Sequence, residues 1–207
     1  MQKQYMNNKD LLIVFTKNPV LGACKTRLAK TMGDQEALRI YEALIDYTIS
    51  FTEKVASKKH VYYSDFVPNS DKWSLPNFEK FKQTEGNLGA KMSNAFNESF
   101  KKGFDKVVII GSDCAEINEK DIQLAFEQLR KHDTVIGPAV DGGYYLLGMN
   151  HPILDLFIDK SWSTPELINE TISTLKRLEK SFYLLPEKSD IDYEQDLYRQ
   201  NYLSVEV

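Results

Sequence analysis

"LLIVFT", residues 11–16, is the stretch of this sequence that decides the fold. Its apolar side chains follow one another without a polar residue until Thr16, whereas a strand with one face in water alternates polar and apolar residues. A short continuous apolar run is typical of a parallel strand that helices cover on both faces. "KVVII", residues 106–110, has the same character. We therefore expect residues 11–16 to form a central strand and residues 106–110 a second buried one.

Segments with helical spacing of apolar residues alternate with strand-like runs along the chain. The spacing predicts helices over residues 34–56, between Gly86 and Gly103, and over residues 118–129 and 164–179, with "HVYYS", "DTVIG", "YYLLGM" and "SFYLL" as further strands. Asp34, Asn118 and Thr164 stand where side chains cap a helix N-terminus, and residues 65–80 are predicted to be an irregular connection. This alternation predicts an α/β fold with three layers around a mostly parallel sheet.

Length, composition and charge narrow the class of protein. A chain of 207 residues with 42% hydrophobic content predicts one domain over residues 1–207. The net charge of -4, with Lys and Glu interspersed, argues against nucleic-acid binding and favours small-molecule chemistry. Cys24 and Cys114 are too few for a disulfide scaffold and are expected to be small buried residues. No signal-peptide core and no apolar run of roughly 18 residues is present, so we expect a soluble cytoplasmic protein without a membrane partner.

A basic loop follows the first predicted strand. Ligands in α/β sheets collect beyond the carboxyl ends of the strands. There, "TKNPVLGACKTRLA", residues 16–29, carries Lys17, Lys25 and Arg27, and Gly22 suits a turn. Cations and exposed backbone amides are what phosphate oxygens need, although the GxxxxGK[ST] spacing is absent. The alternative is an ordinary solvated basic loop.

Acidic residues follow other predicted strands. Asp113 comes after "KVVII", Asp141 precedes a glycine pair, and Asp192 lies in "SDIDYEQDL" after the last strand. Carboxylates brought together repel one another unless a cation or a proton intervenes, so removing one is expected to relieve that repulsion. Mg²⁺ or Mn²⁺ takes such oxygen ligands, which predicts a divalent-metal site at Asp113, Asp141 and Asp192. The alternative for Asp113 is a cap of the following helix or turn.

"GPAVDGGYYLLGM", residues 137–149, is a strand-like run with a break in the middle. Gly142 and Gly143 would let the backbone approach a ligand closely, although a glycine pair also makes an ordinary hairpin turn. Tyr144, Tyr145 and Trp162 could stack on a base or a sugar, and core packing is the commoner use of such residues.

Six motifs together resemble one family over most of the chain: "FTKNPVLGACKTRLA", "NLGAKMSNAF", "VVIIGSDC", "GPAVDGGYYLLGM", "WSTPELI" and "DIDYEQDL". The chain is similar to the small GT-A-like nucleotide-diphospho-sugar transferases, the DUF2064-type glycosyltransferases known as radical-SAM- or selenodomain-associated transferases. The resemblance implies a single Rossmann-like domain of the GT-A type that holds a nucleotide over the strand ends with a divalent metal. Two positions depart from the family pattern. Ala115 replaces a usual proline, and Tyr193 replaces a usual threonine beside Asp192.

On this chain the resemblance implies phosphate binding by Lys17, Lys25 and Arg27, with the acidic positions at Asp113, Asp141 and Asp192. Gly22, Gly142 and Gly143 complete the predicted nucleotide-binding residues.

The predicted reaction is transfer of a glycosyl group from a nucleotide sugar to a small acceptor. The metal and the basic loop would stabilise the diphosphate leaving group, so Lys25, Arg27 and Asp113 are the predicted catalytic residues. Nucleotidyl transfer that releases pyrophosphate is the alternative, because "KTRLA" also resembles a loop of guanylyltransferases. A nucleotide-binding regulator without turnover is the third possibility.

Overall fold

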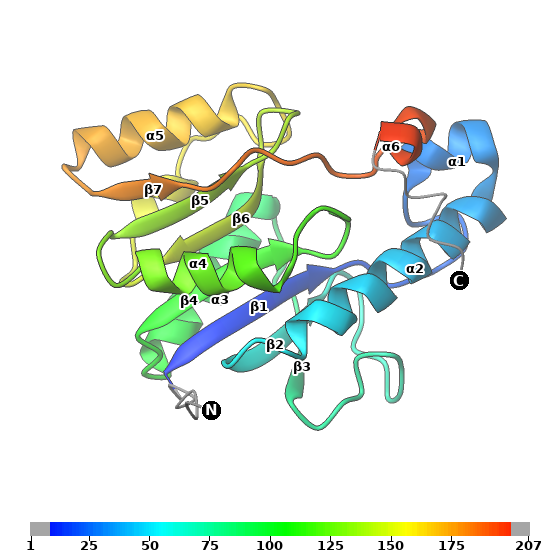
Figure 1. Cartoon of the computed structure of the whole chain (residues 1–207), viewed down its shortest axis with the longest axis horizontal. Helices are drawn as coiled ribbons and strands as arrows, with labels where there is room; N and C mark the ends of the chain where they lie inside the picture. Colours follow the sequence, from blue (N-terminus) through cyan, green and yellow to red (C-terminus); the bar gives the residue numbers. More distant parts are fainter. Residues whose placement is uncertain (1–8, 200–207) are drawn as a thin grey trace.

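A single seven-stranded sheet organises the computed structural model, which describes residues 9–199 (Figure 1). The strands lie in the order β3-β2-β1-β4-β6-β5-β7. Their bounds are β1 Asp10–Thr16, β2 Lys58–Tyr63, β3 Phe78–Lys82, β4 Lys106–Gly111, β5 Thr134–Pro138, β6 Tyr144–Met149 and β7 Phe182–Leu184. The predicted domain limits, residues 1–207, extend beyond the described residues and stay a prediction.

Strand β1 lies inside the sheet, as its sequence predicts. It pairs in parallel with β2 on one side and with β4 on the other. Residues 11–14 are 0% exposed, so both faces of the strand are covered. Among the strands of the described residues 9–199, β6 alone runs against its neighbours, because it is antiparallel to both β4 and β5. The predicted α/β fold with a mostly parallel sheet is therefore confirmed.

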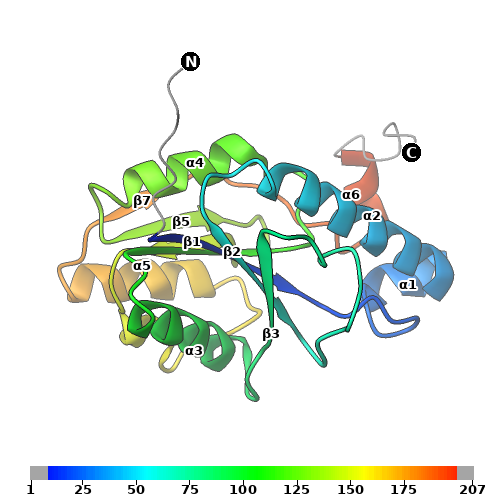
Figure 2. The same ribbon diagram turned by 90° about the horizontal axis from the view of Figure 1, so that it is seen from below.

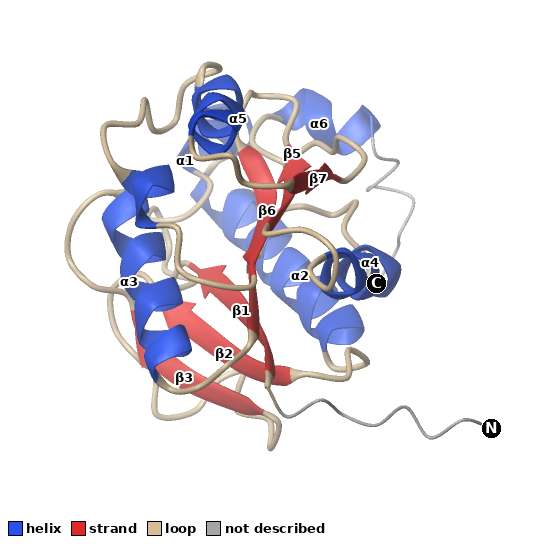
Figure 3. Cartoon of the chain, turned by 90° about the vertical axis from the view of Figure 1, so that its left-hand side faces the viewer, coloured by secondary structure: helices blue, strands red, loops and turns tan. Residues whose placement is uncertain are grey.

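Helices cover both faces of the sheet (Figures 2 and 3). The helices are α1 Thr26–Met32, α2 Asp34–Thr52, α3 Leu88–Lys101, α4 Glu119–Gln128, α5 Leu167–Arg177 and α6 Glu194–Arg199, with a 3-10 turn, η1, over Leu154–Phe157. Leu12 and Val14 pack into one core with α2 and α4. Leu11 and Ile13 face the opposite way, into a second core with α3 and α5. The alternation of side chains along β1 thus builds the three layers.

Four elements were not predicted from the sequence: α1, β3, η1 and α6. Strand β3 lies inside the segment 65–80 and just beyond it, where an irregular connection was expected. Its sequence, "FEKFK", mixes aromatic and charged residues. The charged residues are tolerated because β3 is an edge strand with one neighbour. Helix α1 occupies part of the expected basic loop and buries only Leu28, too little to give a helical pattern. Arg27 therefore projects from a helix.

The predicted helix caps are right in one case and wrong in two. The Asn118 side chain accepts a hydrogen bond from the Lys120 amide and forms a capping box with Asp121. Asp34 is the first residue of α2, and Gly33 occupies the cap position. Helix α5 begins at Leu167, so Thr164 is no cap, and its hydroxyl donates to the Ser161 carbonyl. Spacing alone does not fix helix ends, because several polar residues near each end compete for the same amides.

The two cysteines pack as expected. Cys24 and Cys114 are both free and buried, and burial raises the pKa of each thiol. A raised pKa keeps the thiols protonated and makes them poor nucleophiles. Among residues 9–199 we find no helix of the length and apolarity that crossing a bilayer requires.

Candidate functional site

The loops after β1 and β4 meet the segment that follows β7 at the carboxyl edge of the sheet. Figure 1 shows this segment crossing toward α6, which lies beside α1. The Ile191 amide donates a hydrogen bond to the Asp113 carbonyl over 3.2 Å and ties the two chain-distant segments together. The sheet therefore assembles the predicted basic and acidic residues at one edge.

Lys25 lies at the centre of this assembly. Its Nζ donates to Asp113 Oδ2 over 3.1 Å and to Asp192 Oδ1 over 3.2 Å. Arg27 Nη1 donates to the other oxygen of Asp192, Oδ2, over 2.8 Å. The Lys25 side chain is only 4% exposed, whereas those of Asp113 and Asp192 are 40% and 34% exposed. The network thus presents two carboxylates and a guanidinium to solvent above a buried ammonium.

The charges of this network hold one another in the ionised form. Burial by itself would lower the pKa of Lys25, but the carboxylates of Asp113 and Asp192 raise it above its usual value. Burial would raise the pKa of Asp113, but the Lys25 ammonium outweighs it, so that pKa is lowered. The cation that resolves the expected carboxylate repulsion is therefore a lysine of the chain itself.

Lys25 also has an unusual backbone conformation. It is the N-cap residue of α1 and has φ 46° and ψ 44°, in the left-handed region. A residue with a Cβ rarely adopts that region, at a cost of roughly 1–2 kcal/mol. Strain of this kind is retained where the surrounding structure fixes a side chain for a function.

Asp190 is a member of the site, although the sequence prediction chose Asp192 from the same acidic run. Burial, followed by the negative charges of Asp113, Asp141 and Asp192, raises its pKa to about 8, against the opposing charge of Lys25. Its Oδ1 is buried and has no hydrogen-bond partner within residues 9–199. Asp190 stands in the same "SDID" run as Asp192, and sequence alone could not tell which of the two carboxylates would contact Lys25.

Asp141 is placed differently from the other two predicted metal ligands. Its Oδ1 accepts a hydrogen bond from the Gly143 amide over 2.9 Å, which closes a local turn. It contributes to the charge around Asp190 but contacts neither Lys25 nor Arg27. The structure therefore joins Asp113 and Asp192 through Lys25 and leaves Asp141 outside that network.

Gly142 is required by the packing of the chain itself. It has φ +87°, and a Cβ at this position would lie 2.3 Å from the Pro165 Cα. Its carbonyl accepts a hydrogen bond from the Ile168 amide over 2.9 Å, at the start of α5. The break in the strand thus lets the segment before α5 dock closely. Nucleotide binding by Gly142 and Gly143 stays a prediction.

We expect Gly142→Ala to destabilise the fold by about 1–3 kcal/mol more than Gly33→Ala, because overpacking has that cost. Gly33 is a matched control, since it has φ +82° but no atom within 4 Å of the added Cβ. Urea unfolding of both variants measures the difference. Equal destabilisation of the two variants would show that backbone strain, not the Pro165 contact, selects glycine.

Tyr41 joins the two loops that carry the site. Its hydroxyl accepts a hydrogen bond from the Lys17 amide over 2.7 Å. It also lies 3.0 Å from Ser112 Oγ, next to Asp113, and 3.1 Å from Thr16 Oγ1. The residue is 2% exposed on α2. In the sequence Tyr41 is one more apolar position of a helix, so nothing there signals this role.

The aromatic residues proposed for stacking belong to the core. Tyr145 is 3% exposed, and Tyr144 packs edge-to-face against Trp162 with ring centres 6.4 Å apart. Trp162 stacks on Phe157 over 6.3 Å. Their packing follows the commoner of the two alternatives. Tyr193, the departure from the family pattern, instead lies beneath the Arg27 guanidinium, 5.8 Å from ring centre to Cζ.

The carboxylates can be tested for their fit to a divalent metal. Within residues 9–199, no three or more His, Cys, Asp or Glu side chains are grouped so that they alone could hold a metal ion. Mg²⁺, however, is usually bound by one or two carboxylates together with substrate phosphates, so a complete protein cage is unnecessary. Asp113 and Asp192 supply such a pair, and the buried Asp190 Oδ1 lacks a partner. The donor set therefore fits a metal that is shared with a substrate.

Comparison with known proteins identifies similar chains. Residues 48–164 match the family model described as "Uncharacterized protein conserved in bacteria (DUF2064)". A crystal structure of a "putative nucleotide-diphospho-sugar transferase" from Desulfovibrio desulfuricans G20 is 28% identical, with a TM-score of 0.86, and the match covers 96% of this chain and 90% of that one. No curated protein matches this chain.

Two further structures show the same fold at low identity. CMP:2-keto-3-deoxy-manno-octonic acid synthetase complexed with CTP is 10% identical with a TM-score of 0.59, covering 95% of this chain and 98% of that chain. The 4-diphosphocytidyl-2C-methyl-D-erythritol synthase from Anaerococcus prevotii is 8% identical with a TM-score of 0.60, covering 96% of this chain and 98% of that chain. Both matches extend over nearly the whole chain and show the fold alone.

Proposed function

This chain belongs to the DUF2064 family of bacterial proteins, and from that premise we propose that it is a metal-dependent, nucleotide-using transferase. The reaction proposed is transfer of a glycosyl group from a nucleotide sugar to a small acceptor. One observation carries the proposal: buried Lys25 joins Asp113 and Asp192 at the carboxyl edge of the sheet, beside Arg27. The 28% identical structure named for nucleotide-diphospho-sugar transfer supports the choice of donor.

The chain's own cations would bind the phosphates of the donor. Lys17 lies close enough to lower the pKa of Asp113, and Lys25 and Arg27 already bind carboxylate oxygens. Phosphate oxygens can exchange with those carboxylate oxygens, because both accept hydrogen bonds from cations. As the glycosyl bond breaks, negative charge grows on the diphosphate, and fixed cations stabilise it.

Asp113 and Asp192 would hold Mg²⁺ or Mn²⁺ together with the donor phosphates, and the metal would supply further neutralisation of the leaving group. Their carboxylates would also keep Lys25 charged and oriented. The raised pKa of Lys25 and the lowered pKa of Asp113 support this role. Free, buried Cys24 and Cys114 are consistent with a reducing, cytoplasmic setting.

Nucleotidyl transfer with release of pyrophosphate is the second candidate. The two low-identity structures named above are a CMP-sugar synthetase bound to CTP and a diphosphocytidyl synthase, and each is matched over nearly its whole length. The same basic loop could bind a triphosphate. The two candidates differ in which bond of the nucleotide breaks, so the donor decides between them.

A thermal-shift panel tests the proposal. Nucleoside triphosphates and nucleotide sugars are each added with Mg²⁺, Mn²⁺ or a chelator. A ligand that binds only the folded state at a hundredfold excess over Kd stabilises it by about 2.7 kcal/mol. We expect a metal-dependent rise in Tm for at least one base, larger for the nucleotide sugar than for its triphosphate, followed by product formation with that donor.

Other outcomes discriminate among the candidates. A larger shift with the triphosphate, together with pyrophosphate release on turnover, would favour nucleotidyl transfer. Binding without any product, across acceptors of different chemistry, would favour a nucleotide-binding regulator. If no nucleotide shifts Tm under any metal condition, the nucleotide-using transferase is refuted.

A further inference from the structure

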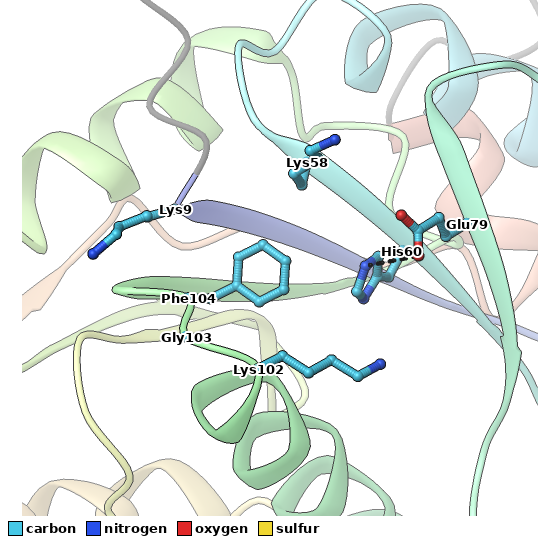
Figure 4. Close-up of a pocket in the computed structure, with 7 residues that line it drawn as sticks. All are labelled: Lys9, Lys58, His60, Glu79, Lys102, Gly103 and Phe104. Carbon is cyan, nitrogen blue, oxygen red and sulfur yellow. Dashed lines mark ion pairs between the residues drawn. The ribbon is translucent and has the colours of Figure 1, made fainter.

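A cavity of about 370 Å³ opens at the amino-terminal edge of the sheet (Figure 4). Its wall comes from elements that begin or end there. Lys58 is the first residue of β2, Lys102 follows α3, and Phe104 lies just before β4. The network around Lys25 lies at the opposite, carboxyl edge of the same strands. The cavity is therefore separate from the candidate active site.

The lining of this cavity is basic, although the chain as a whole has a net charge of -4. Three of its residues are lysines and only Glu79 is acidic. Lys9 forms an ion pair with Asp105 over 3.5 Å. Lys58 and Lys102, by contrast, are exposed and make no ion pair with any residue of the described range 9–199. Two lysine charges thus lie at one cavity without counter-charges of their own.

His60 forms part of the cavity wall and is incompletely hydrogen-bonded. It is 3% exposed and packs against Phe81 and Phe104, with ring centres 4.7 Å and 5.6 Å away. Its Nδ1 is buried without a hydrogen-bond partner among the residues described. Its Nε2 lies 3.7 Å from Glu79 Oε2, beyond hydrogen-bond distance. A buried polar group left unpaired is costly, and such groups usually have a structural or functional reason.

Lys58 and Lys102 act on His60 electrostatically, although the Lys102 ammonium also lies over the Phe81 ring, 4.7 Å from its centre. Burial is the main reason that the pKa of His60 is lowered to about 4; Glu79 opposes the shift, and the smaller contributions of the Lys102 and Lys58 charges add to it. The imidazole is therefore neutral at neutral pH. Both ammonium groups are near enough for their charges to be felt at the ring, so a ligand that neutralised them would be felt there too.

We propose that this cavity is a second binding site of the protein, for a small oxyanion with two or more negative charges, held by Lys58 and Lys102 beside His60. Such a ligand would give both lysines the charge-assisted hydrogen bonds that they lack within the described chain. The shared chemistry is that of a phosphoryl group or a compact polycarboxylate. The cavity volume is within the usual range of small-molecule sites. This inference does not rest on the proposed transferase activity.

The imidazole of His60 is a local reporter for the test. The chain has three histidines, so His60, His132 and His151 can be followed separately by NMR of their ring protons, with assignment by His60→Gln. Inorganic phosphate, pyrophosphate, citrate and sodium chloride are titrated at matched ionic strength. We expect a saturable shift of the His60 signal with an oxyanion, and a rise of its pKa from about 4, because the ligand offsets the lysine charges. Comparing the response to phosphate with the response to citrate shows whether the site prefers a phosphoryl group or a polycarboxylate.

Variants locate the binding. Lys58→Gln combined with Lys102→Gln should weaken oxyanion binding, read at His60, by at least about tenfold. Both lysines are exposed, so the fold should tolerate the change, and Lys120→Gln on α4 serves as the matched control. The proposal is overturned if the His60 signal responds to no oxyanion or responds equally to chloride. It is also overturned if the double variant binds the oxyanion as tightly as the unaltered protein.

Discussion

Replacing Lys25 by methionine is expected to reduce transferase activity by about 100-fold or more, and to destabilise the fold by about 1–3 kcal/mol. The activity loss follows from removing a fixed cation where charge develops on the leaving group. The stability loss follows because Asp113 and Asp192 lose the cation that pairs them. Breaking a buried pair costs more than this, but both carboxylates are partly exposed and solvent screens them. Steady-state kinetics and urea unfolding measure the two effects.

A matched control and a double variant make the Lys25 experiment decisive. Lys30→Met, an exposed lysine of the same helix α1, should change neither activity nor stability appreciably. Adding Asp113→Asn to Lys25→Met should recover part of the lost stability, since it removes an uncompensated charge; the double-mutant cycle gives the coupling energy. Mg²⁺ should likewise stabilise Lys25→Met more than the unaltered protein. Unchanged stability in Lys25→Met would contradict the bridging role of the lysine.

Asp113→Asn is expected to reduce metal-dependent activity by about 100- to 1,000-fold, the scale found for removal of a group that organises transition-state charge. Its stability effect should be a small loss. The carboxylate repulsion that the sequence suggested would make this variant more stable, but the structure reverses the sign because Lys25 already neutralises Asp113. Activity at several Mg²⁺ and Mn²⁺ concentrations, with Tm in chelator, measures both effects.

The pH dependence of Asp113 follows from its lowered pKa. A carboxyl whose pKa is lower in the folded state stabilises the protein above its unfolded pKa, and this stabilisation is lost as the pH falls through the folded value. Below the usual Asp range the stabilities of the unaltered protein and Asp113→Asn should therefore converge. Asp46→Asn, which breaks an exposed ion pair with Lys72, is the control for a surface carboxylate. Full activity in Asp113→Asn would refute its catalytic and metal-binding roles together.

Much of the fold could be predicted because burial leaves a direct record in the sequence. Residues 11–15 and 107–110 are continuously apolar, since both faces of a parallel strand are covered, and they lie in β1 and β4. Strand β3 could not be predicted, because an edge strand tolerates charged residues that conceal its pattern. The short helix α1 buries too few residues to produce a periodic signal.

By itself, the sequence determined which residues would gather at one edge of the sheet. Lys17, Lys25, Asp113 and the acidic run after the last strand all follow predicted strands, and parallel strands bring their carboxyl ends to the same edge. This placement needs only the strand pattern and the chain direction, because right-handed crossovers leave few other arrangements.

Only the tertiary structure decided which of these residues touch. Lys25 meets a carboxylate 88 residues away and another 167 residues away, and no local pattern encodes such a contact. It also placed Asp141 in a local turn, brought in Asp190, and assigned Gly142 to a contact with Pro165. The physical reason is that ion pairs and close backbone contacts depend on distances of a few ångströms, which the packing of the whole sheet and its helices sets.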